Sequence, residues 1–563
     1  MKKVRKLASL ALALIMAFTF IPVLSITAVA AEGDYLWADF ACEEKNGNFE
    51  MTHLVVHLEG TVTSEPTVDI TSWTMDGAAW DIATAPSLVK PGQLSTADGV
   101  TTYTLQLSVP LVMTSNYVLN FTCGGAAKAA EATVHDLAAL GDGAISLDNR
   151  PGTHVVKGAY SAAPDNAGSL IGSTTNGFKG TLVLWNVDIN LTNRWATQYG
   201  VGAQAVSLWG MAGTAPEIIL QGQNKITATN GSADDSLTGA FFMQNAKVTG
   251  SGSLDIAIGA GKAMHTQGTS ILNANISAVS GKGAGIVNYD DLKITGGTII
   301  AKGGEANYAG SNLYGVNGRY PDQFFAGIVA GRSLDISGGT VYAEGGFGIM
   351  TRGGNITIGA PTTAKANPVL GETGNYAGAG IGMMPSGGTL TINSTLVATG
   401  GESGINSRGG AGIFLSGSTM VVGPAGDVTA TGGKATGTDP GDDCGNGVFA
   451  ESYSSSLKSA ITVNGKLTAI GAEGASGKSG EHGLLLRCSS LHVGATGELT
   501  MRGGNSGNDY GQSYGMYVYD KTGSSSPGES VWSKDVGAKV SAYVGANQRN
   551  GYNTPCVKFV SGS

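Results

Sequence analysis

A repeated unit of alternating apolar residues most constrains what this chain can fold into. The segment from Ala326 to Gly346 reads AGIVAGRSLDISGGTVYAEGG and holds three short apolar runs, each closed by a glycine or a polar turn. Leu334 and Ile336 would share one face of a strand, and Val341 and Ala343 the same face of the next. Such period-two alternation indicates half-buried strands. Because the unit recurs along the chain, it predicts a β-solenoid.

Residues of the same kind recur at the same place in each unit. Each unit opens with a glycine before an apolar residue, at Gly285, Gly327, Gly348, Gly380, Gly412, Gly447, Gly483 and Gly515. The second run recurs as Leu292/Ile294, Leu334/Ile336, Leu390/Ile392, Met420/Val422, Ile461/Val463 and Leu491/Val493, and the third as Ile299/Ala301, Val341/Ala343, Leu396/Ala398, Val428/Ala430, Leu467/Ala469 and Leu499/Met501. These columns predict three strands per coil, each pairing in parallel with its copy in the next coil at about 4.8 Å.

The predicted fold is therefore all-β, with a parallel β-helix over residues 141–520 and a C-terminal coil and cap over 521–563. We expect it to be right-handed, because crossovers between parallel strands nearly always are. Gly296-Gly297, Gly338-Gly339 and Asn464-Gly465 separate the second run from the third and predict corners with positive φ.

Residues 1–30 predict a secretory signal peptide. Four basic residues precede an apolar run from Leu7 to about Ile26, and Ala28-Val29-Ala30 offers a small-residue cleavage site. The alternative is a retained membrane anchor. The signal peptide predicts a secreted, extracellular protein, held at the cell surface or released, without a membrane span after cleavage.

Residues 32–138 have few Gly-Gly pairs and longer alternating runs, which predicts a small β-sandwich of immunoglobulin type. The runs are Leu54–Leu58, Thr102–Leu107 and Tyr117–Phe121, around Trp73 and Trp80. The alanine-rich stretch Ala126–Ala139 predicts a linker or a short helical cap over the solenoid.

Cysteine positions suggest one disulfide. Cys42 lies near the start of the predicted sandwich and Cys123 near its end, so in an exported domain a disulfide would tie its first strand to its last. Two separate buried thiols are the alternative. Cys444, Cys488 and Cys556 remain as an odd number.

Composition excludes two classes of protein. The formal net charge is −9 over 563 residues, which argues against nucleic acid or an anionic membrane as a partner. The 89 glycines do not recur at every third position, so the chain is not a collagen.

The stretch from Ala215 to Gly252, with IILQGQNKITATNG and VTGSGSLDI, and the AGI…LxIxGGTVxAxGG units after it resemble the glycine-rich parallel β-helices of secreted clostridial and related Firmicute surface proteins. The resemblance covers roughly residues 141–520. It implies a carbohydrate-binding or adhesin-like role, and no catalytic residue of that family maps onto this chain.

Nearly all of the surplus residues fall at one corner of the coil, after the third run, and insertions gathered on one side commonly form a binding face. The surplus segments are residues 305–325, 367–379, 402–410, 434–446, 472–482 and 505–514. Their candidate ligand-binding residues are Tyr308, Tyr314, Arg319, Tyr320, Asp322, Tyr376, Asp509 and Tyr510. Aromatic rings beside carboxylates suit sugars, which offer apolar faces and rim hydroxyls. The alternative is that the tyrosines pack onto the solenoid and shield it.

One of these segments is acidic. Asp439, Asp442 and Asp443 lie within five residues and make a candidate calcium site, because calcium prefers oxygen ligands. The segment lacks EF-hand spacing, so a solvated acidic turn is the alternative. The pair Asp290-Asp291 is interpreted as a corner cap rather than a catalytic dyad.

The favoured function is a non-catalytic binding protein or adhesin that recognises a polysaccharide or glycan, with a host or cell-surface protein as another candidate partner. It requires no cofactor, and calcium is the one candidate ion. The first alternative is a polysaccharide lyase or glycoside hydrolase, since parallel β-helices host both, although the chain lacks their Asn-Thr-Asp, Asp-Asp and Gly-His-Gly set on successive coils. The second is a structural surface fibre.

Overall fold

The chain folds almost entirely into strands. The computed structural model describes residues 33–45, 48–97, 99–141, 143–148, 150–161, 169–173, 177–191, 204–210, 216–228, 239–304, 325–368, 378–384, 387–403, 409–434, 445–452, 454, 457–474, 480–505, 513–520, 529–545 and 556–561. Within these ranges a single short 3-10 turn, η1 (Leu137–Ala139), interrupts 44 strands. No helix in the described ranges is long and apolar enough to cross a membrane. The chain divides into two compact units, residues 1–132 and 133–563.

The first unit consists of two antiparallel sheets. One has the order β1 (Tyr35–Lys45), β2 (Asn48–Glu59), β6 (Val100–Val112) and β5 (Leu88–Ala97). The other has the order β4 (Ala78–Trp80), β3 (Val68–Met75), β7 (Tyr117–Cys123) and β8 (Ala126–Asp136). The sheets pack through aromatic side chains, since the rings of Phe40 on β1 and Trp73 on β3 lie 6.0 Å apart.

The prediction of a linker or helical cap over Ala126–Ala139 is wrong. Residues 126–136 form β8, which pairs with β7, and only the last three residues form η1. Ala130 and Ala132 are fully buried while their neighbours face outward, so here small side chains fill a sheet interface rather than a helix. Tertiary packing outweighs the helix propensity of alanine.

The predicted disulfide between Cys42 and Cys123 is not formed. The Cys42 thiol lies 3.5 Å from the carbonyl oxygen of Phe40, well along β1. Cys123 instead lies near Tyr35, at the start of β1, where its charge interaction is one of the causes that raise the pKa of the Tyr35 phenol, after burial. Tyr35 and Cys42 are seven residues apart on one strand, about 23 Å at strand rise, which no disulfide spans.

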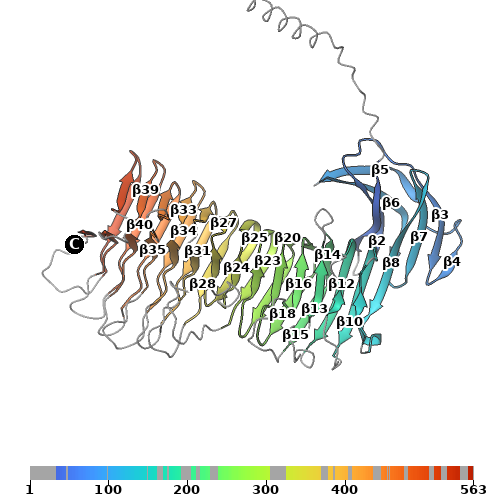
Figure 1. Ribbon diagram of the computed structural model, residues 1–563, viewed down its shortest axis with the longest axis horizontal. Helices are drawn as coiled ribbons and strands as arrows, with labels where there is room; N and C mark the ends of the chain where they lie inside the picture. The colour runs from blue at the N-terminus through green and yellow to red at the C-terminus, as the bar shows by residue number, and fades with distance from the viewer. Residues whose placement is uncertain are drawn as a thin grey trace, which may run out of the picture. The chain divides into compact units, whose positions relative to one another are not determined.

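The second unit is built from parallel strands stacked on their copies (Figure 1). The first stack is a 14-stranded sheet. It comprises β9 (Ile145–Ser146), β11 (Ser169–Gly172), β13 (Gln204–Trp209), β16 (Phe241–Gln244), β19 (Met264–Gln267), β22 (Ile286–Asn288), β24 (Ile328–Ala330), β26 (Ile349–Arg352), β29 (Ile381–Met384), β32 (Ile413–Ser416), β35 (Val448–Glu451), β38 (Leu484–Arg487), β41 (Met516–Asp520) and β44 (Val557–Ser561). This parallel architecture is the one that the repeats predict.

Two further stacks complete each coil, and the long strands β10 (Gly152–Tyr160), β12 (Gly180–Asn190), β23 (Asp291–Lys302) and β25 (Ser333–Gly345) run through both. The second stack adds β14 (Glu217–Gln221), β17 (Lys247–Thr249), β20 (Thr269–Asn273), β27 (Asn355–Ile358), β30 (Thr389–Ile392), β33 (Thr419–Val422), β36 (Ala460–Val463), β39 (Ser490–Val493) and β42 (Val531–Lys534). The third adds β15 (Gln223–Ala228), β18 (Ser253–Ile258), β21 (Asn275–Ser280), β28 (Thr362–Ala366), β31 (Thr395–Thr399), β34 (Asp427–Thr431), β37 (Lys466–Ile470), β40 (Glu498–Arg502) and β43 (Lys539–Tyr543).

The apolar columns predicted from the repeats form the core. Leu292 pairs with Leu334, and Leu390 with Met420, all at most 1% exposed. One coil is absent from the columns predicted from the sequence. Its Ile356 pairs with Leu334 on one side and with Leu390 on the other. Its third strand carries Thr362 where other coils have a branched apolar residue, so the repeat is harder to recognise.

The corners follow the prediction at two of the three glycine pairs. Gly297 and Gly339 have φ of 75° and 77°. Gly465 is not among the positive-φ residues; its constraint is close approach, because an added Cβ would lie 2.2 Å from the carbonyl oxygen of Gly423. Positive φ and close approach both exclude a side chain, but only positive φ is a matter of backbone conformation.

Candidate functional site

The surplus segments all leave the third stack and enter the first. For example, β23 ends at Lys302 and β24 begins at Ile328, whereas β25 ends at Gly345 and β26 begins at Ile349 with no surplus. The topology therefore places every predicted insertion at one corner of the coil, as the repeats predict. The residues predicted to bind ligand within them, Tyr308, Tyr314, Arg319, Tyr320, Asp322, Tyr376, Asp509 and Tyr510, lie outside the described residues and stay predictions.

The candidate calcium ligands Asp439, Asp442 and Asp443 also lie outside the described residues. Within the described part of the chain, no three histidine, cysteine or acidic side chains gather as a metal site would require. The calcium prediction therefore stays untested.

The outer face of the first stack, next to this corner, is apolar in the middle coils. Val287, Val329 and Met350 point away from the central core, yet each is fully buried in a second apolar cluster. Parallel sheets buried on both faces show such continuous apolar runs. In the middle coils this face is packing surface.

The same face changes character in the last coils, where aromatic and basic side chains replace aliphatic ones. Residues in register run from Phe414 through Phe449 and Leu485 to Tyr517 and Lys558. A neighbouring column carries Glu451, Arg487 and Tyr519. We call the set His482, Arg487, Tyr514, Tyr517, Tyr519 and Lys558 the aromatic–basic patch.

Three rings form the platform of the patch. The rings of His482 and Tyr517 stack 4.6 Å apart at 17°, and that of Tyr514 lies 5.7 Å from Tyr517. The Tyr514 N–H donates to Nδ1 of His482 at 3.2 Å, so neutral His482 carries its proton on Nε2. Burial lowers the pKa of His482 to about 4, with the charge of Lys558 acting in the same direction. The His482 imidazole is therefore uncharged at neutral pH.

Two cations lie over tyrosine rings of the patch. Lys558 Nζ is 5.1 Å from the ring centre of Tyr514 and 5.9 Å from that of Tyr517, within cation–π range. The guanidinium of Arg487 is 6.0 Å from the ring centre of Tyr519. Tyr517, Tyr519 and Lys558 are half-buried, which leaves part of each ring and the ammonium open to solvent.

Two carboxylates of the described residues border the patch, and one of them, Glu481, has its Oε2 4.0 Å from Nε2 of His482. Glu451 Oε2 lies 3.4 Å from Nη1 of Arg487, and its side chain is 19% exposed. Burial raises the pKa of Glu451, and the neighbouring Arg487 guanidinium opposes that rise. We regard burial as the larger effect, since a single contact at 3.4 Å is a weak ion pair.

A second ring series on this stack lies deeper. Lys262 Nζ donates to the Tyr289 hydroxyl at 2.9 Å, and the ring of His265 meets that of Tyr289 edge-on at 4.8 Å. Lys262 and His265 are only 4% and 3% exposed, so a ligand reaches them only if the surrounding structure opens. The aromatic–basic patch is the more accessible site.

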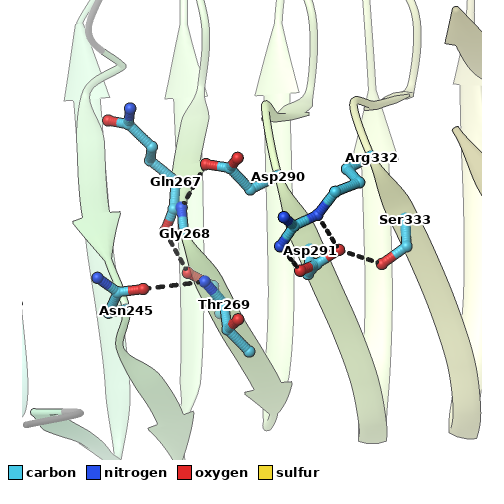
Figure 2. A network of polar contacts seen from close by, with 9 residues as sticks. Asn245, Gln267, Gly268, Thr269, Asp290, Asp291, Arg332 and Ser333 are labelled. Atoms are coloured by element: carbon cyan, nitrogen blue, oxygen red, sulfur yellow. Dashed lines mark hydrogen bonds and ion pairs between the residues drawn. The ribbon is translucent and has the colours of Figure 1, made fainter. Parts of the chain in front are cut away.

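The acidic pair at Asp290-Asp291 is structural, as predicted (Figure 2). Asp290 accepts a hydrogen bond from the Gly268 N–H at 2.8 Å, beside Asn245, which accepts one from the Thr269 N–H at 3.0 Å. Asp291 pairs with Arg332 and accepts from the Ser333 hydroxyl at 2.6 Å. These contacts, together with the positive charge of Arg332, lower the pKa of Asp291. Both carboxylates are engaged in holding successive coils together.

Tyr514, Tyr517 and Tyr519 are not among the candidate ligand-binding residues predicted from the sequence. Tyr517 and Tyr519 lie on β41, inside the first stack. The signal was available: Gly515-Met516 opens a coil like the others, so alternation places Tyr517 and Tyr519 on its outer face.

No protein-family profile, curated protein or solved structure matches this chain. The candidate site therefore stands on its geometry.

Proposed function

We propose that this protein is a secreted or cell-surface, non-catalytic binding protein that recognises a polysaccharide or glycan through the aromatic–basic patch and the insertions beside it. The observation that carries the proposal is the half-buried Tyr517 ring, which stacks on His482 and has Lys558 over it, next to Tyr519 with Arg487 over its ring. Ring faces of this kind pack against the C–H faces of sugars, and cationic N–H groups reach their rim oxygens.

Binding without cleavage is favoured because the two carboxylates beside the patch, Glu451 and Glu481, each lie against a side chain of the patch, Arg487 and His482 respectively. Glycosidases generally place two carboxyl groups on opposite sides of the scissile bond. Glu451 contacts Arg487, which ties it to the adjacent coil. We propose that it positions the guanidinium rather than transferring a proton.

We also propose the finer architecture that the sequence predicts: a right-handed β-helix after an immunoglobulin-type sandwich. The strand orders β1-β2-β6-β5 and β4-β3-β7-β8 correspond to sheets ABED and C′CFG of that fold. Two further features support it. Trp73 is buried on the strand equivalent to C, and the Tyr117 hydroxyl donates to the carbonyl of Val112 at 3.1 Å near the start of the strand equivalent to F.

The test is binding of the protein without residues 1–30 to a panel of neutral and acidic polysaccharides, with reducing ends measured in each mixture. We expect binding without new reducing ends, weakened about tenfold or more in Tyr517→Ala, because a ring contact contributes about 1–2 kcal/mol. The matched control is Tyr342→Ala, another half-buried tyrosine with a lysine over its ring, but on the third stack.

Other outcomes identify the alternatives. New reducing ends would establish a polysaccharide-degrading enzyme. Polysaccharide binding that is present without a chelator and lost when one is added would point to the acidic segment with Asp439, Asp442 and Asp443. The absence of binding to any polysaccharide would overturn the proposal and favour a protein partner or a structural surface fibre.

A further inference from the structure

Two of the lysines that lie over half-buried tyrosine rings, Lys302 and Lys558, differ in whether a carboxylate lies beside the ammonium. On the third stack, Lys302 Nζ lies 5.4 Å from the ring centre of Tyr342 and also 3.3 Å from Glu344 Oε2. The Tyr342 hydroxyl donates to the same carboxylate at 2.9 Å. The cation at that position is neutralised within the protein.

Lys558 in the aromatic–basic patch is not neutralised in this way. Among the residues that the structure describes, no carboxylate lies within ion-pair distance of Lys558. Its ammonium is held over Tyr514 and Tyr517, where a cation–π contact positions the charge without cancelling it. The N–H groups directed away from the rings remain available as donors.

Arg487 adds a second cation that is only partly engaged. Its guanidinium makes one contact to Glu451, at 3.4 Å, and 42% of the side chain is exposed. A guanidinium has five N–H donors, and Glu451 is the one carboxylate among the described residues within ion-pair distance of them. Because Arg487 lies beside Tyr519 and Lys558 beside Tyr517, two residues apart on β41, the two cations border neighbouring rings of the patch.

We propose that the glycan bound at this patch carries carboxylate groups, and that Lys558 and Arg487 bind them while the tyrosine rings contact the sugar faces. This inference rests on the proposed function. In a uronate, the carboxylate projects from the rim of the sugar ring, so a sugar stacked on Tyr517 would direct it toward a cation beside that ring. The chain as a whole has a net charge of −9, so general attraction to anions does not account for such a preference.

The experiment compares polygalacturonate with its fully methyl-esterified form, which has the same backbone without charge. We expect the wild type to bind polygalacturonate about tenfold more tightly, and Lys558→Gln or Arg487→Gln to reduce that affinity about three- to fivefold each, the size expected of exposed ion pairs. Binding of the methyl ester should not change in either variant. Lys558→Arg should keep the preference, and the compensated Lys302→Gln should have no effect. Raising the salt concentration should weaken binding of the acid form only.

The outcomes separate this inference from the proposal beneath it. Equal affinity for the acid and the ester, or binding of neutral polysaccharides alone, would overturn the inference and leave glycan binding standing. Failure to bind any polysaccharide would overturn both. Equally tight binding of poly-L-glutamate, unaffected by Tyr517→Ala, would also overturn the inference, because the patch would then recognise acidic peptide by charge alone.

Discussion

Single residues in this protein are constrained mainly by the coil above or below them. Gly339 has a φ of 77°, and a Cβ added there would lie 2.3 Å from the carbonyl oxygen of Gly297 in the preceding coil. At the neighbouring corner, a Cβ on Gly268 would lie 2.0 Å from Oδ1 of Asn245, the oxygen that accepts the Thr269 N–H. Close stacking therefore accounts for much of the glycine content.

We expect Gly339→Ala to lower the free energy of unfolding by about 2 kcal/mol or more. The left-handed conformation alone costs a residue with a Cβ about 1–2 kcal/mol, and the approach to a rigid carbonyl adds to it. Urea unfolding measures the change. Thr340→Ala, at an exposed neighbour, is the control and should lie within about 0.5 kcal/mol of the wild type. Similar losses in the two variants would contradict this account.

His482 makes stability depend on pH. Its pKa is lowered from 6.5 to about 4 in the folded protein, chiefly by burial, so between these values the unfolded chain binds a proton that the folded chain does not. The free energy of unfolding is therefore unaffected by this group above about pH 6.5 and falls as the pH drops toward 4. His482 accounts for at most about 3 kcal/mol of that loss.

The measurement is the free energy of unfolding at pH 7 and pH 4.5 for the wild type and His482→Gln. The variant should lose less stability between the two values. His135, whose pKa burial and His154 also lower to about 4, remains in both proteins and cancels in the comparison. An identical loss in both proteins would show that His482 does not titrate as the structure implies.

At the scale of elements, the strands differ in how completely their neighbours cover them. Ile413, in the middle of the first stack, is fully buried, with strands β29 and β35 on either side. In the last coil, Trp532 on β42 aligns with the core residue Leu491 but is 38% exposed, and Phe559 on β44 is 60% exposed. A coil with a neighbour on one side keeps about half of its interfaces.

We expect the backbone amides of β42, β43 and β44 to exchange with solvent at least about tenfold faster than those of β32, β33 and β34. In stacked repeats, stability is a sum of nearest-neighbour interfaces, so an end coil opens locally more easily than an interior one. Hydrogen exchange followed by mass spectrometry measures this. Equal protection of the two groups of strands would mean that the terminal coil is stabilised by contacts beyond its strand pairing.

At the scale of the whole molecule, the repeats build a core that runs from one coil to the next and leave the outer faces free to vary. The inward columns keep branched and small side chains from β14 to β40, whereas the outer face of the first stack changes from Val329 to Tyr517. The aromatic–basic patch draws on strands β38, β41 and β44 with the residues that precede them, so it exists only where consecutive coils lie in register.

Much of the fold could be predicted from the sequence, because periodicity is a local property. Alternating pairs such as Leu334/Ile336 and corner glycines such as Gly339 predict strands and turns without any knowledge of the residues that lie next to them in the fold. The same reasoning failed at Ala126–Asp136, where alanine favours a helix but pairing with β7 produces a strand. It also failed at Cys42 and Cys123: their positions near the two ends of the domain sequence suggested a disulfide, but the length of β1 keeps the two thiols apart.

The sequence by itself determined the parallel stacking, the apolar columns and the corner that receives the insertions, since each follows from spacing along the chain. The tertiary structure alone decided which outward side chains meet. Tyr514, Tyr517 and Lys558 are distant in sequence from Arg487 and become neighbours because strands β38, β41 and β44 pair in one register. The tertiary structure likewise decides that Lys302 has a carboxylate beside it, whereas Lys558 has none among the described residues. The reason is that a charge is compensated by its neighbours in space, which need not be its neighbours in sequence.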